Sequence, residues 1–585
     1  MCSIIGYSGM SLAAPPLVRG LRRMEYRGYD SAGVATLASG GIAVRKGVGR
    51  VDEVNRRYHL DELPGSVGIG HTRWATHGGV TEANAHPHLS SAGRIALVHN
   101  GIVENYVELR EMLTERGFRF RSETDSEAIA NLLEWHHSRT GDARAALRAT
   151  VSELTGNFAF AALFPDGTLG AARFHEPLIV GIGPAGYYVA SDILGFVDRT
   201  DRVLYLGNRE LVTIGRRGIF VCDFDGRPVR HDVVRVAEEV ANAGKGDYVH
   251  HTLKEIFEQP LTIPRAGRGP SALAEASAAL SRARRVYITG SGSSFNAALV
   301  GKYLLSKHAG IAAETLISSE MKFSPVRMDG ETVVMAISQS GESADILEAV
   351  NIARERGATI VSVVNVMGSS LAQLSSVAVG LDCGPEIGVA ATKSFSAQLA
   401  VLYGIAGALS EGSAGTSLAE APERVSEVLR GHLKIKELAD KLAGISDVYV
   451  LGRGIHYAIA AEASLKLKEL AYVHAEALHG GELKHGPLAL LDSESRVIIL
   501  NPSDSTYRDV LASAHEVKAR GAKVIGISDR PSEIYDDWIE IPSTPEDLFP
   551  LVELIPTQLL AYYLAVRRNE NPDYPRNLAK SVTVK

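Results

Sequence analysis

The chain has 585 residues, of which 45% are hydrophobic and 22% are charged, and 61 Lys and Arg against 68 Asp and Glu give a formal charge of −7. This composition is typical of a soluble globular protein of about three to four domains, and it excludes collagen, coiled coils and wholesale disorder. The mild acidity gives no electrostatic reason to expect nucleic acid or an anionic membrane as a partner, and no apolar run approaches the roughly 20 residues of a transmembrane helix.

The N-terminus places a cysteine at position 2. It lacks the basic stretch and apolar segment of a secretory signal, so we expect a cytoplasmic protein. Removal of Met1 is favoured by the small residue that follows, and the mature chain would then begin with the Cys2 thiol beside a free α-amine. An amine with a reference pKa of about 7.7–8.0 can take the thiol proton, which is the N-terminal nucleophile arrangement. A residue in a frayed terminus is the alternative.

The first ~215 residues contain short β-rich runs, such as 95–99 and 158–164, bounded by turn signals. Two helical patterns interrupt them, near 104–116 and 125–137, and Thr124 is the predicted N-cap of the second. Strand runs with few helices predict an α+β layered domain.

Polar residues that suit amide chemistry lie at three places in this domain. Asn100-Gly101 follows a strand run; the pair is most often a hairpin turn, but it can also present a side-chain amide and a backbone N–H to an oxyanion. Arg73 offers a bidentate fork for a carboxylate. Asp125 suits an ammonium group, or it is an acid in the first turn of a helix. Together with Cys2, these groups indicate an amino-acid amide as substrate.

Residues 2–215 resemble the class II glutamine amidotransferase domain. The matching sequence motifs are Cys2 and residues 26–33, 71–78, 99–101 and 122–125. The resemblance implies an αββα sandwich of the N-terminal-nucleophile type. It also implies that Cys2 is the nucleophile and that Asn100 and Gly101 stabilise the oxyanion. Arg73 and Asp125 would hold the α-carboxylate and α-amino groups of glutamine, with Thr76 and His77 nearby. Ser3 stands where this family usually has glycine.

The pattern changes after residue ~220. A linker with a short amphipathic helix is expected first, and after ~275 continuous apolar strands alternate with helices, which indicates parallel sheets covered on both faces. The pattern at 285–292 recurs at 447–454, which predicts two doubly wound α/β domains from a duplication. The expected limits are 2–217 for the α+β domain, 218–265 for the linker, 266–425 and 426–575 for the α/β domains, and 576–585 for a C-terminal tail.

Two loops in the first α/β domain suit a phosphate. Residues 290–294 and 338–343 each follow a strand and precede a helix, so their N–H groups and hydroxyls converge on the crevice where such folds bind ligands. A plain turn between strand and helix is the alternative. Neither loop fits a Walker A or dinucleotide sequence, which favours a small phosphorylated ligand over ATP or NAD. The loops resemble those of SIS domains, which bind phosphosugars. The resemblance implies phosphate contacts from Ser293, Ser294, Ser338, Gln339, Ser340 and Ser343.

The join of both domain types resembles the family of isomerising glutamine–fructose-6-phosphate aminotransferases over essentially the whole chain. Further matching words lie at 254–260, 386–393, 465–469, 474–477, 481–488 and 575–584. The resemblance implies transfer of the glutamine amide nitrogen to fructose 6-phosphate and isomerisation to glucosamine 6-phosphate, the first step of UDP-N-acetylglucosamine synthesis.

The same resemblance assigns the sugar chemistry. His485 would open the ring, since histidine shuttles protons near neutral pH. Lys580 would form a Schiff base with the ketone. Glu469 would move the proton from C1 to C2, with Lys466 at i,i+3 on the same helical face. The sugar pocket would be lined by Glu386 and Val389.

Each of these residues also has an ordinary structural explanation. A lysine near a C-terminus is usually solvated, the Lys466–Glu469 pair is typical of a helix surface, and His485 before Gly-Pro suits a cap. Ser291 stands where many relatives have cysteine, and we expect altered phosphate affinity rather than lost function.

Two sites on different domains require ammonia to travel between them without meeting water, because protonated ammonia is no nucleophile. Trp74 resembles the gating tryptophan of the family, or it is a plain core aromatic. The tail with Lys580 is expected to cross between domains. A homodimer is expected, since a histidine matching His485 comes from the neighbouring subunit in the family. We expect no metal and no organic cofactor, and the three cysteines fit neither a disulfide framework nor a zinc site.

Two other functions stay open. SIS folds also serve as non-catalytic phosphosugar-binding regulators, although such a sensor would not need Cys2, Glu469 and Lys580 together. A different amidotransferase would use the same glutaminase half, but its diphosphosugar or ATP site requires motifs that the sequence lacks.

Overall fold

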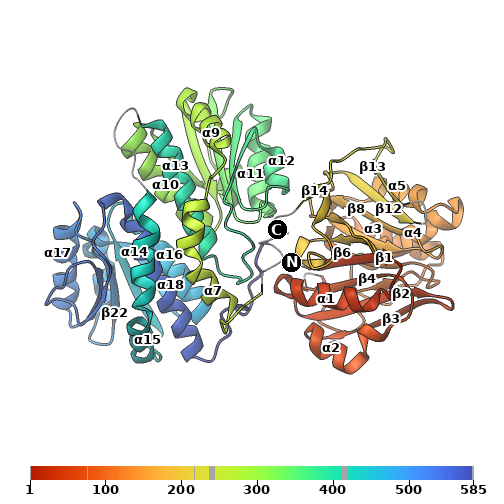
Figure 1. Cartoon of the computed structure of the whole chain (residues 1–585), viewed down its shortest axis with the longest axis horizontal. Helices are drawn as coiled ribbons and strands as arrows, with labels where there is room; N and C mark the ends of the chain where they lie inside the picture. The colour runs from red at the N-terminus through yellow and green to blue at the C-terminus, as the bar shows by residue number, and fades with distance from the viewer. Residues whose placement is uncertain (1, 76, 216–217, 236–243, 411–417, 583–585) are drawn as a thin grey trace. The chain divides into compact units, whose positions relative to one another are not determined.

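The computed structural model describes residues 2–75, 77–215, 218–235, 244–410 and 418–582. The chain forms two compact units, Met1–Ala243 with Ala579–Lys585, and Gly244–Leu578 (Figure 1). The first unit contains the α+β domain, and the second contains both parallel-sheet domains.

Two antiparallel sheets form the centre of the first unit. The larger has the strand order β14-β11-β9-β10-β1-β4-β2-β3 and the smaller has the order β13-β12-β8-β7-β6-β5. The strands of the larger sheet are β1 (Ser3–Gly9), β2 (Ser31–Ala38), β3 (Gly41–Val48), β4 (Val67–Arg73), β9 (Ile179–Ile182), β10 (Gly186–Ala190), β11 (Arg202–Tyr205) and β14 (Val234–Arg235). Those of the smaller sheet are β5 (His88–Leu89), β6 (Ala96–Val103), β7 (Gly156–Leu163), β8 (Leu169–Phe174), β12 (Glu210–Gly215) and β13 (Gly218–Asp223).

The sheets pack face to face, and helices cover their outer faces. Ile4 and Ile69 of the larger sheet share one buried apolar cluster with Val98 and Ala161 of the smaller sheet. Helices α1 (Ala14–Met24) and α2 (Val51–Tyr58) pack on the larger sheet, and α4 (Ser126–Thr140) and α5 (Ala143–Glu153) pack on the smaller one. A further helix, α3 (Tyr106–Glu115), packs beside α4. These four layers confirm the predicted αββα sandwich.

Two local expectations differ from the structure. The N-cap of α4 is Asp125 rather than Thr124, because the Glu127 carboxylate accepts from the Ser122 backbone N–H at 2.7 Å, outside the capping-box position. The segment expected as a linker is divided between the two units. Strand β13 pairs with β12 and β14 pairs with β11, so the α+β domain continues beyond the expected limit at residue 217. Helices α7 (His251–Phe257) and α8 (Gln259–Thr262) belong to the second unit.

The second unit contains two five-stranded parallel sheets with equivalent strand orders, β16-β15-β17-β18-β19 and β21-β20-β22-β23-β24. In the first domain the strands are β15 (Arg285–Gly290), β16 (Ala313–Ile317), β17 (Thr332–Ser338), β18 (Thr359–Val364) and β19 (Val377–Gly380). In the second domain they are β20 (Asp447–Gly452), β21 (His474–His479), β22 (Arg496–Leu500), β23 (Lys523–Ser528) and β24 (Asp537–Glu540). The repeated order confirms the predicted duplication.

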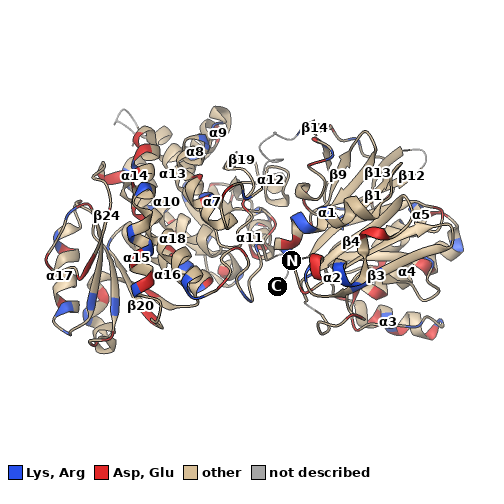
Figure 2. Ribbon diagram, turned by 60° about the horizontal axis from the view of Figure 1, so that its bottom comes forward, with Lys and Arg blue, Asp and Glu red and all other residues tan. Residues whose placement is uncertain are grey.

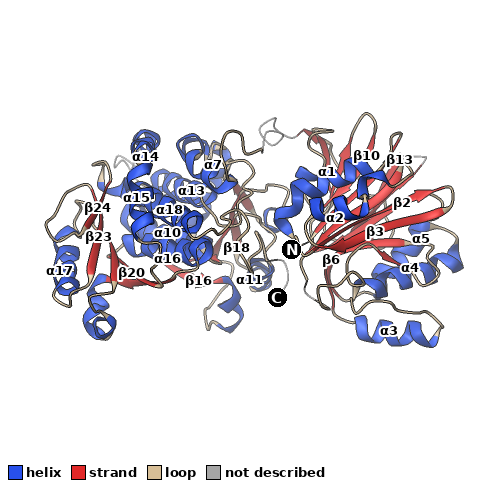
Figure 3. Cartoon of the chain, turned by 90° about the horizontal axis from the view of Figure 1, so that it is seen from below, coloured by secondary structure: helices blue, strands red, loops and turns tan. Residues whose placement is uncertain are grey.

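Four apolar helices lie between the two parallel sheets (Figure 3). They are α10 (Ser293–Ala309), α13 (Lys393–Leu409), α16 (His456–Ala471) and α18 (Phe549–Arg567). Their buried side chains form one continuous cluster with residues of both sheets, so the two domains share a core. The remaining helices of the unit are α9 (Pro270–Arg282), α11 (Ala344–Glu355), α12 (Ser370–Leu374), α14 (Ala421–Arg430), α15 (His432–Lys441) and α17 (Tyr507–Lys518).

One long apolar helix corrects the expectation that no run suits a membrane span. Among the helices in the described residues, only Glu546–Arg567, which includes α18, is long and apolar enough to cross a membrane by length and composition. Its apolar stretch of 18 residues is 94% buried inside the protein, as in the core helix of a folded domain. Few charged positions mark α13 and α18 in Figure 2, as expected for helices that cross a folded core.

Candidate active sites

The candidate nucleophile, Cys2, directly precedes β1. The Trp74 backbone N–H donates to its Sγ at 3.2 Å, and the Trp74 carbonyl oxygen lies 3.5 Å from the same sulfur. Burial raises the pKa of the Cys2 thiol, while Arg73 acts in the opposite direction. A thiol with a raised pKa needs a base to form the thiolate, which fits the α-amine of a chain that begins at Cys2.

Asn100 and Gly101 lie inside β6, so they do not form the hairpin turn that the pair most often makes. The Asn100 side chain is buried, and its Nδ2 donates to the Cys2 carbonyl oxygen at 3.1 Å. Gly101 has φ +99°, and a Cβ there would lie 2.1 Å from the Asn157 carbonyl oxygen. Only glycine fits this position, and the pair sits beside the nucleophile, as an oxyanion hole requires.

Arg73 ends β4 and donates to its own loop. One guanidinium nitrogen lies 3.0 Å from the Gly79 carbonyl oxygen and another lies 3.1 Å from that of Gly78. Burial lowers the pKa of Arg73, while Cys2 and Asp125 raise it, so these groups lie within electrostatic reach of the guanidinium. The structure therefore gathers the expected nucleophile, carboxylate clamp and ammonium partner in one region of the domain.

The other glutamine-site residues are placed less directly. The Asp125 carboxylate is buried and accepts from the Val103 backbone N–H at 2.9 Å. The His77 ring packs edge-on against Tyr106, with ring centroids 5.7 Å apart. Thr76 lies outside the described residues, so its expected role stays a prediction.

Two aromatic or basic residues complete the surroundings of Cys2. Trp74 is half-buried, and its ring packs edge-on against Tyr29 with centroids 5.5 Å apart. Arg27 is buried, donates from Nε to the Cys2 carbonyl oxygen at 3.3 Å and pairs with Asp192 at 3.4 Å. Arg27 was missed as a site residue although it lies in the matching motif 26–33, because its distance of 25 positions from Cys2 gives no local signal of this contact.

The two expected phosphate loops lie at one edge of the first parallel sheet, because β15 and β17 are adjacent and parallel. Ser293 and Ser294 are the first residues of α10, and the Ser294 hydroxyl accepts from Gln398 at 3.0 Å. In the second loop the Ser338 hydroxyl accepts from the Gly341 N–H at 3.0 Å. Gln339, Ser340 and Ser343 lie between β17 and α11, with Ser343 at the N-cap of α11. Two helix N-termini with serine hydroxyls favour an anion.

Of the expected Lys466–Glu469 surface pair, the lysine is buried and the glutamate is partly exposed. The Lys466 side chain is fully buried, and its Nζ lies 2.5 Å from Glu469, 3.3 Å from Glu462 and 3.2 Å from the Ser293 hydroxyl. Burial disfavours the ammonium, but the two carboxylates outweigh it and raise the pKa of Lys466. The expected surface pair is therefore an internal cation with two carboxylates, beside the first residue of the phosphate helix.

Glu462 was missed by sequence reasoning. Its buried carboxylate accepts from the Ser293 hydroxyl and from Asn296 Nδ2, both at 2.8 Å. Burial raises its pKa, and Lys466 opposes this. The contact joins α16 of the second domain to α10 of the first, so α16 carries the candidate base and also holds the phosphate loop.

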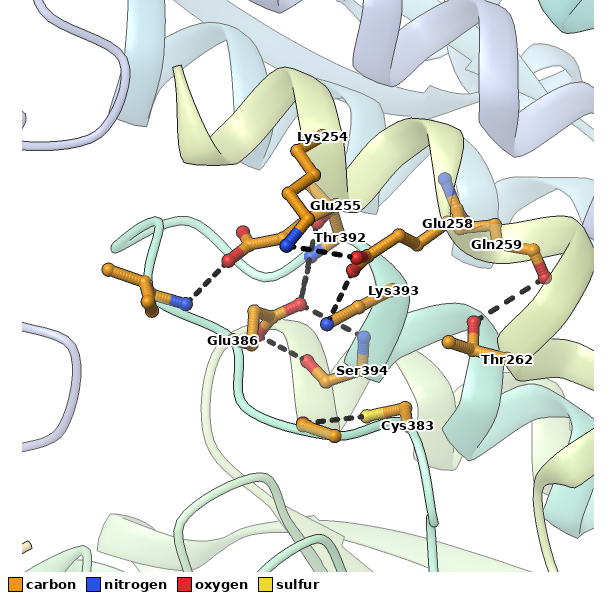
Figure 4. Close-up of polar contacts among 12 residues, drawn as sticks. Lys254, Glu255, Glu258, Gln259, Thr262, Cys383, Glu386, Thr392, Lys393 and Ser394 are labelled. Carbon is orange, nitrogen blue, oxygen red and sulfur yellow. Dashed lines mark hydrogen bonds and ion pairs between the residues drawn. The ribbon is translucent and has the colours of Figure 1, made fainter. Parts of the chain in front are cut away.

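Glu386 and Val389 belong to a loop that is held from two sides (Figure 4). The buried Glu386 carboxylate accepts from the backbone N–H groups of Thr392 and Ser394, both at 2.9 Å, at the start of α13. Glu255 of α7 accepts from the Ile387 N–H at 2.5 Å. The Val389 N–H donates to the Asp573 carbonyl oxygen at 3.3 Å. These contacts fix the loop, and its place in the sugar pocket stays a prediction.

Comparisons with known proteins identify the family. The SIS domain model matches residues 279–406 and 441–568, and a glutamine amidotransferase domain model matches 71–197. The chain is 42% identical over 597 residues to the glutamine–fructose-6-phosphate aminotransferase (isomerizing) of Pyrococcus horikoshii, with 100% of both chains covered. The chain belongs to this aminotransferase family. The family member of Aquifex aeolicus is 40% identical over 594 residues, again over both full lengths.

Solved structures match the second unit. The C-terminal domain of glucosamine-fructose-6-phosphate aminotransferase from Francisella tularensis is 31% identical, covers 57% of this chain and 100% of its own, and gives a TM-score of 0.52. A phosphosugar isomerase from Silicibacter pomeroyi is 26% identical with a TM-score of 0.51, covering 56% of this chain and all of its own. The two SIS domains of this aminotransferase family member are thus the expected α/β pair.

Two sugar-site expectations remain predictions for this aminotransferase family member. His485 is exposed at the end of a short 3-10 helix, Gly480–His485, and Gly486 follows it with φ +134°. Lys580 belongs to the C-terminal residues that group with the first unit.

Proposed function

We propose that this enzyme transfers the amide nitrogen of L-glutamine to D-fructose 6-phosphate and isomerises the product, giving D-glucosamine 6-phosphate and L-glutamate. The observation that carries the proposal is the Lys466–Glu469 pair beside Ser293 in a chain whose other unit holds Cys2 beside Asn100. A glutaminase alone would not need the Lys466–Glu469 pair beside Ser293. A phosphosugar sensor would not need Cys2 beside Asn100.

The first unit supplies glutamine hydrolysis. The Cys2 thiolate attacks the amide carbonyl, and its proton passes to the leaving ammonia through the α-amine. The Asn100 amide and the Gly101 N–H stabilise the oxyanion of the tetrahedral intermediate. Water then releases glutamate from the thioester, which regenerates the thiol.

The second unit supplies the sugar chemistry. The serine hydroxyls and helix N-termini at 293–294 and 338–343 bind the phosphate. Lys580 forms a Schiff base with the C2 ketone of the open-chain sugar and water leaves; ammonia then adds to C2 and displaces the Lys580 amine. Glu469 then takes the proton from C1 and returns it to C2, while the Lys466 ammonium stabilises the charge that develops on the sugar oxygen.

The finer parts of the proposal rest on chemistry. Ammonia passes between the sites out of contact with water, with Trp74 as gate, because protonation would remove its nucleophilic lone pair. Lys580 forms the Schiff base, and a homodimer supplies His485 from the partner subunit for ring opening. The exposure of His485 on its own chain supports this role in a second copy. We place the enzyme in the cytoplasm.

A coupled assay tests the proposal. The protein is incubated with glutamine and fructose 6-phosphate, without ATP or added metal, and glutamate and glucosamine 6-phosphate are measured together. Equal yields of both are expected. Cys2→Ala should lose both with glutamine but make glucosamine 6-phosphate from added ammonia, and Cys222→Ala, a buried cysteine of β13, should keep both activities. Glutamate without amino sugar would indicate another acceptor, and sugar binding without turnover would indicate a regulator.

A further inference from the structure

Four histidines of the glutaminase unit are buried, and the proposed reaction uses none of them. His71, His86, His88 and His99 are each at most 4% exposed. The rings of His71 and His86 stack with centroids 4.1 Å apart, and those of His86 and His88 meet at 4.5 Å. Among the described residues no group of three or more His, Cys, Asp or Glu is arranged to hold a metal ion.

One member of the stack contacts the candidate oxyanion residue. His71 Nε2 lies 3.1 Å from Asn100 Oδ1 and 3.0 Å from the His99 carbonyl oxygen. Both partners are oxygens that only accept, so Nε2 must carry the imidazole proton. The other end of the same amide, Asn100 Nδ2, donates to the Cys2 carbonyl oxygen at 3.1 Å. The amide orientation is therefore fixed by partners at both ends.

The reverse orientation of this amide is disfavoured twice. It would place the Asn100 NH₂ against the His71 N–H, donor against donor, and its oxygen toward the Cys2 carbonyl, acceptor against acceptor. It would also present an oxygen to the developing oxyanion. Because these groups are buried, water cannot satisfy the mismatched groups, and each unpaired group costs its desolvation.

We propose that His71 is a positioning residue of the glutaminase site, whose Nε2–H holds the Asn100 amide with its NH₂ toward the reacting carbonyl. The inference rests on the proposed glutaminase function. His71 lies in β4, paired with both β1 and β2, and its ring is held by the His86 stack, so the donor is rigid. Burial lowers the pKa of His71 to about 3, so the imidazole stays neutral at physiological pH and adds no charge beside Cys2.

The effect on rate follows from the role of an oxyanion donor. Loss of one such donor lowers kcat by about 10²–10³-fold. A free Asn100 amide still donates for part of the time, so His71→Leu should lower the glutaminase kcat by about 10–100-fold, with the KM for glutamine changed by less than about twofold. His71→Gln, which keeps an N–H donor of similar reach, should recover most of the rate.

The experiment uses the full chain and two internal controls. Ammonia-dependent glucosamine 6-phosphate synthesis reports on the second unit and should be unchanged. Alkylation of Cys2 by iodoacetamide occurs at a saturated carbon and develops no oxyanion, so its rate should also be unchanged in His71→Leu. In a double-mutant cycle with Asn100→Ala, the two losses should not add, because His71 acts through Asn100.

Three results would overturn the inference. They are an unchanged kcat in His71→Leu, additive losses in the cycle, or alkylation slowed as much as turnover. If His71→Leu does not fold, ¹⁵N NMR of histidine-labelled wild-type protein, assigned by comparison with His71→Gln, decides the tautomer. A proton on Nδ1 rather than Nε2 of His71 would refute the inference. This last measurement holds even if the protein turns out to have no glutaminase activity, which would refute the proposed function instead.

Discussion

Replacing His456 by leucine should destabilise the second unit by about 3–5 kcal/mol, the usual cost of removing one partner from a buried ion pair. His456 is the first residue of α16, and its two ring nitrogens each lie 2.7 Å from a carboxylate oxygen, Nδ1 from Glu553 and Nε2 from Asp504. The side chains of His456 and Glu553 are fully buried and that of Asp504 is 4% exposed. The leucine variant would leave both carboxylates without their cation.

The pKa of His456 gives a second measure of the same effect. Burial disfavours the imidazolium, but Glu553 and Asp504 outweigh it and raise the pKa from 6.5 to about 10. Such a rise corresponds to about 5 kcal/mol of stabilisation of the charged form. Because the folded pKa lies above the unfolded one, this stability is fully present below pH 6.5 and is lost as the pH rises toward about 10.

Urea unfolding followed by tryptophan fluorescence measures this effect. The chain has three tryptophans, and replacing Trp74 and Trp135 by phenylalanine leaves Trp538, in β24 of the same domain as His456, as the reporter. The difference in unfolding free energy between the parent and His456→Leu should shrink by about 3 kcal/mol between pH 6.5 and 9.5. His474→Leu is the matched control, since its ion pair with Asp447 is exposed, and it should change stability by less than about 1 kcal/mol.

Either of two results would refute this reasoning. One is a loss below about 1 kcal/mol at pH 7, which would mean that the cluster contributes no more than a surface pair. The other is a difference that does not change between pH 6.5 and 9.5, which would mean that the imidazole is not charged in the folded protein.

Three further predictions concern the two sites. Gly388→Ala should lower the free energy of unfolding by about 1–3 kcal/mol and raise the KM for fructose 6-phosphate, because the new Cβ would lie 2.8 Å from a carboxylate oxygen of α7. The control Gly407→Ala has open space around it in α13 and should instead stabilise the protein by about 0.4–1 kcal/mol. Thermal melts and fructose 6-phosphate kinetics on both variants test this difference. Lys466→Met should lower ammonia-dependent synthesis by about 10²–10⁴-fold while glutamine hydrolysis persists, and equal losses of both would contradict the assignment. Protein that retains Met1 should lack glutaminase activity, because Cys2 then has no α-amine; intact-mass spectrometry with activity measurements on both forms tests this, and an active Met1 form would point to another base.

The architecture of the second unit is predictable from sequence because its signals are local. Continuous apolar runs such as 333–337 are the mark of a strand that is buried on both faces, and both parallel sheets follow from them. The end of the α+β domain is harder to predict, because β14 depends on pairing with β11, which lies about 30 residues earlier in the chain. The apolar helix α18 escaped attention because Glu553 and Pro556 interrupt its hydropathy, whereas in the fold it crosses a shared core.

In the candidate sites, too, local contacts are predictable from the sequence and contacts between distant segments are not. The i,i+3 spacing of Lys466 and Glu469 predicts their contact, and the structure has it at 2.5 Å. The burial of Lys466 and its link to Ser293 through Glu462 follow from packing between the two domains. Ser293 and Glu462 are 169 residues apart in the sequence, so no local pattern encodes their contact. The Asn100-Gly101 pair illustrates the limit, since its commonest role is a turn and only the fold places it inside a strand beside Cys2.

The core that the two parallel sheets share allows the two copies of the repeat to carry different functional residues. Neither copy has a complete interior alone, so a chain cut near residue 430 would expose apolar helices that the other half covers. Because the shared core holds the two copies together, one copy can lose functional residues that the other copy retains. The first has hydroxyls at the start of α10, whereas the matching loop of the second, 453–455, has none and is followed by His456, which pairs with Asp504 at 2.7 Å. In the proposed reaction the second copy contributes the helix that transfers the proton, α16, so that one active site would be assembled from two specialised halves of a duplicated fold.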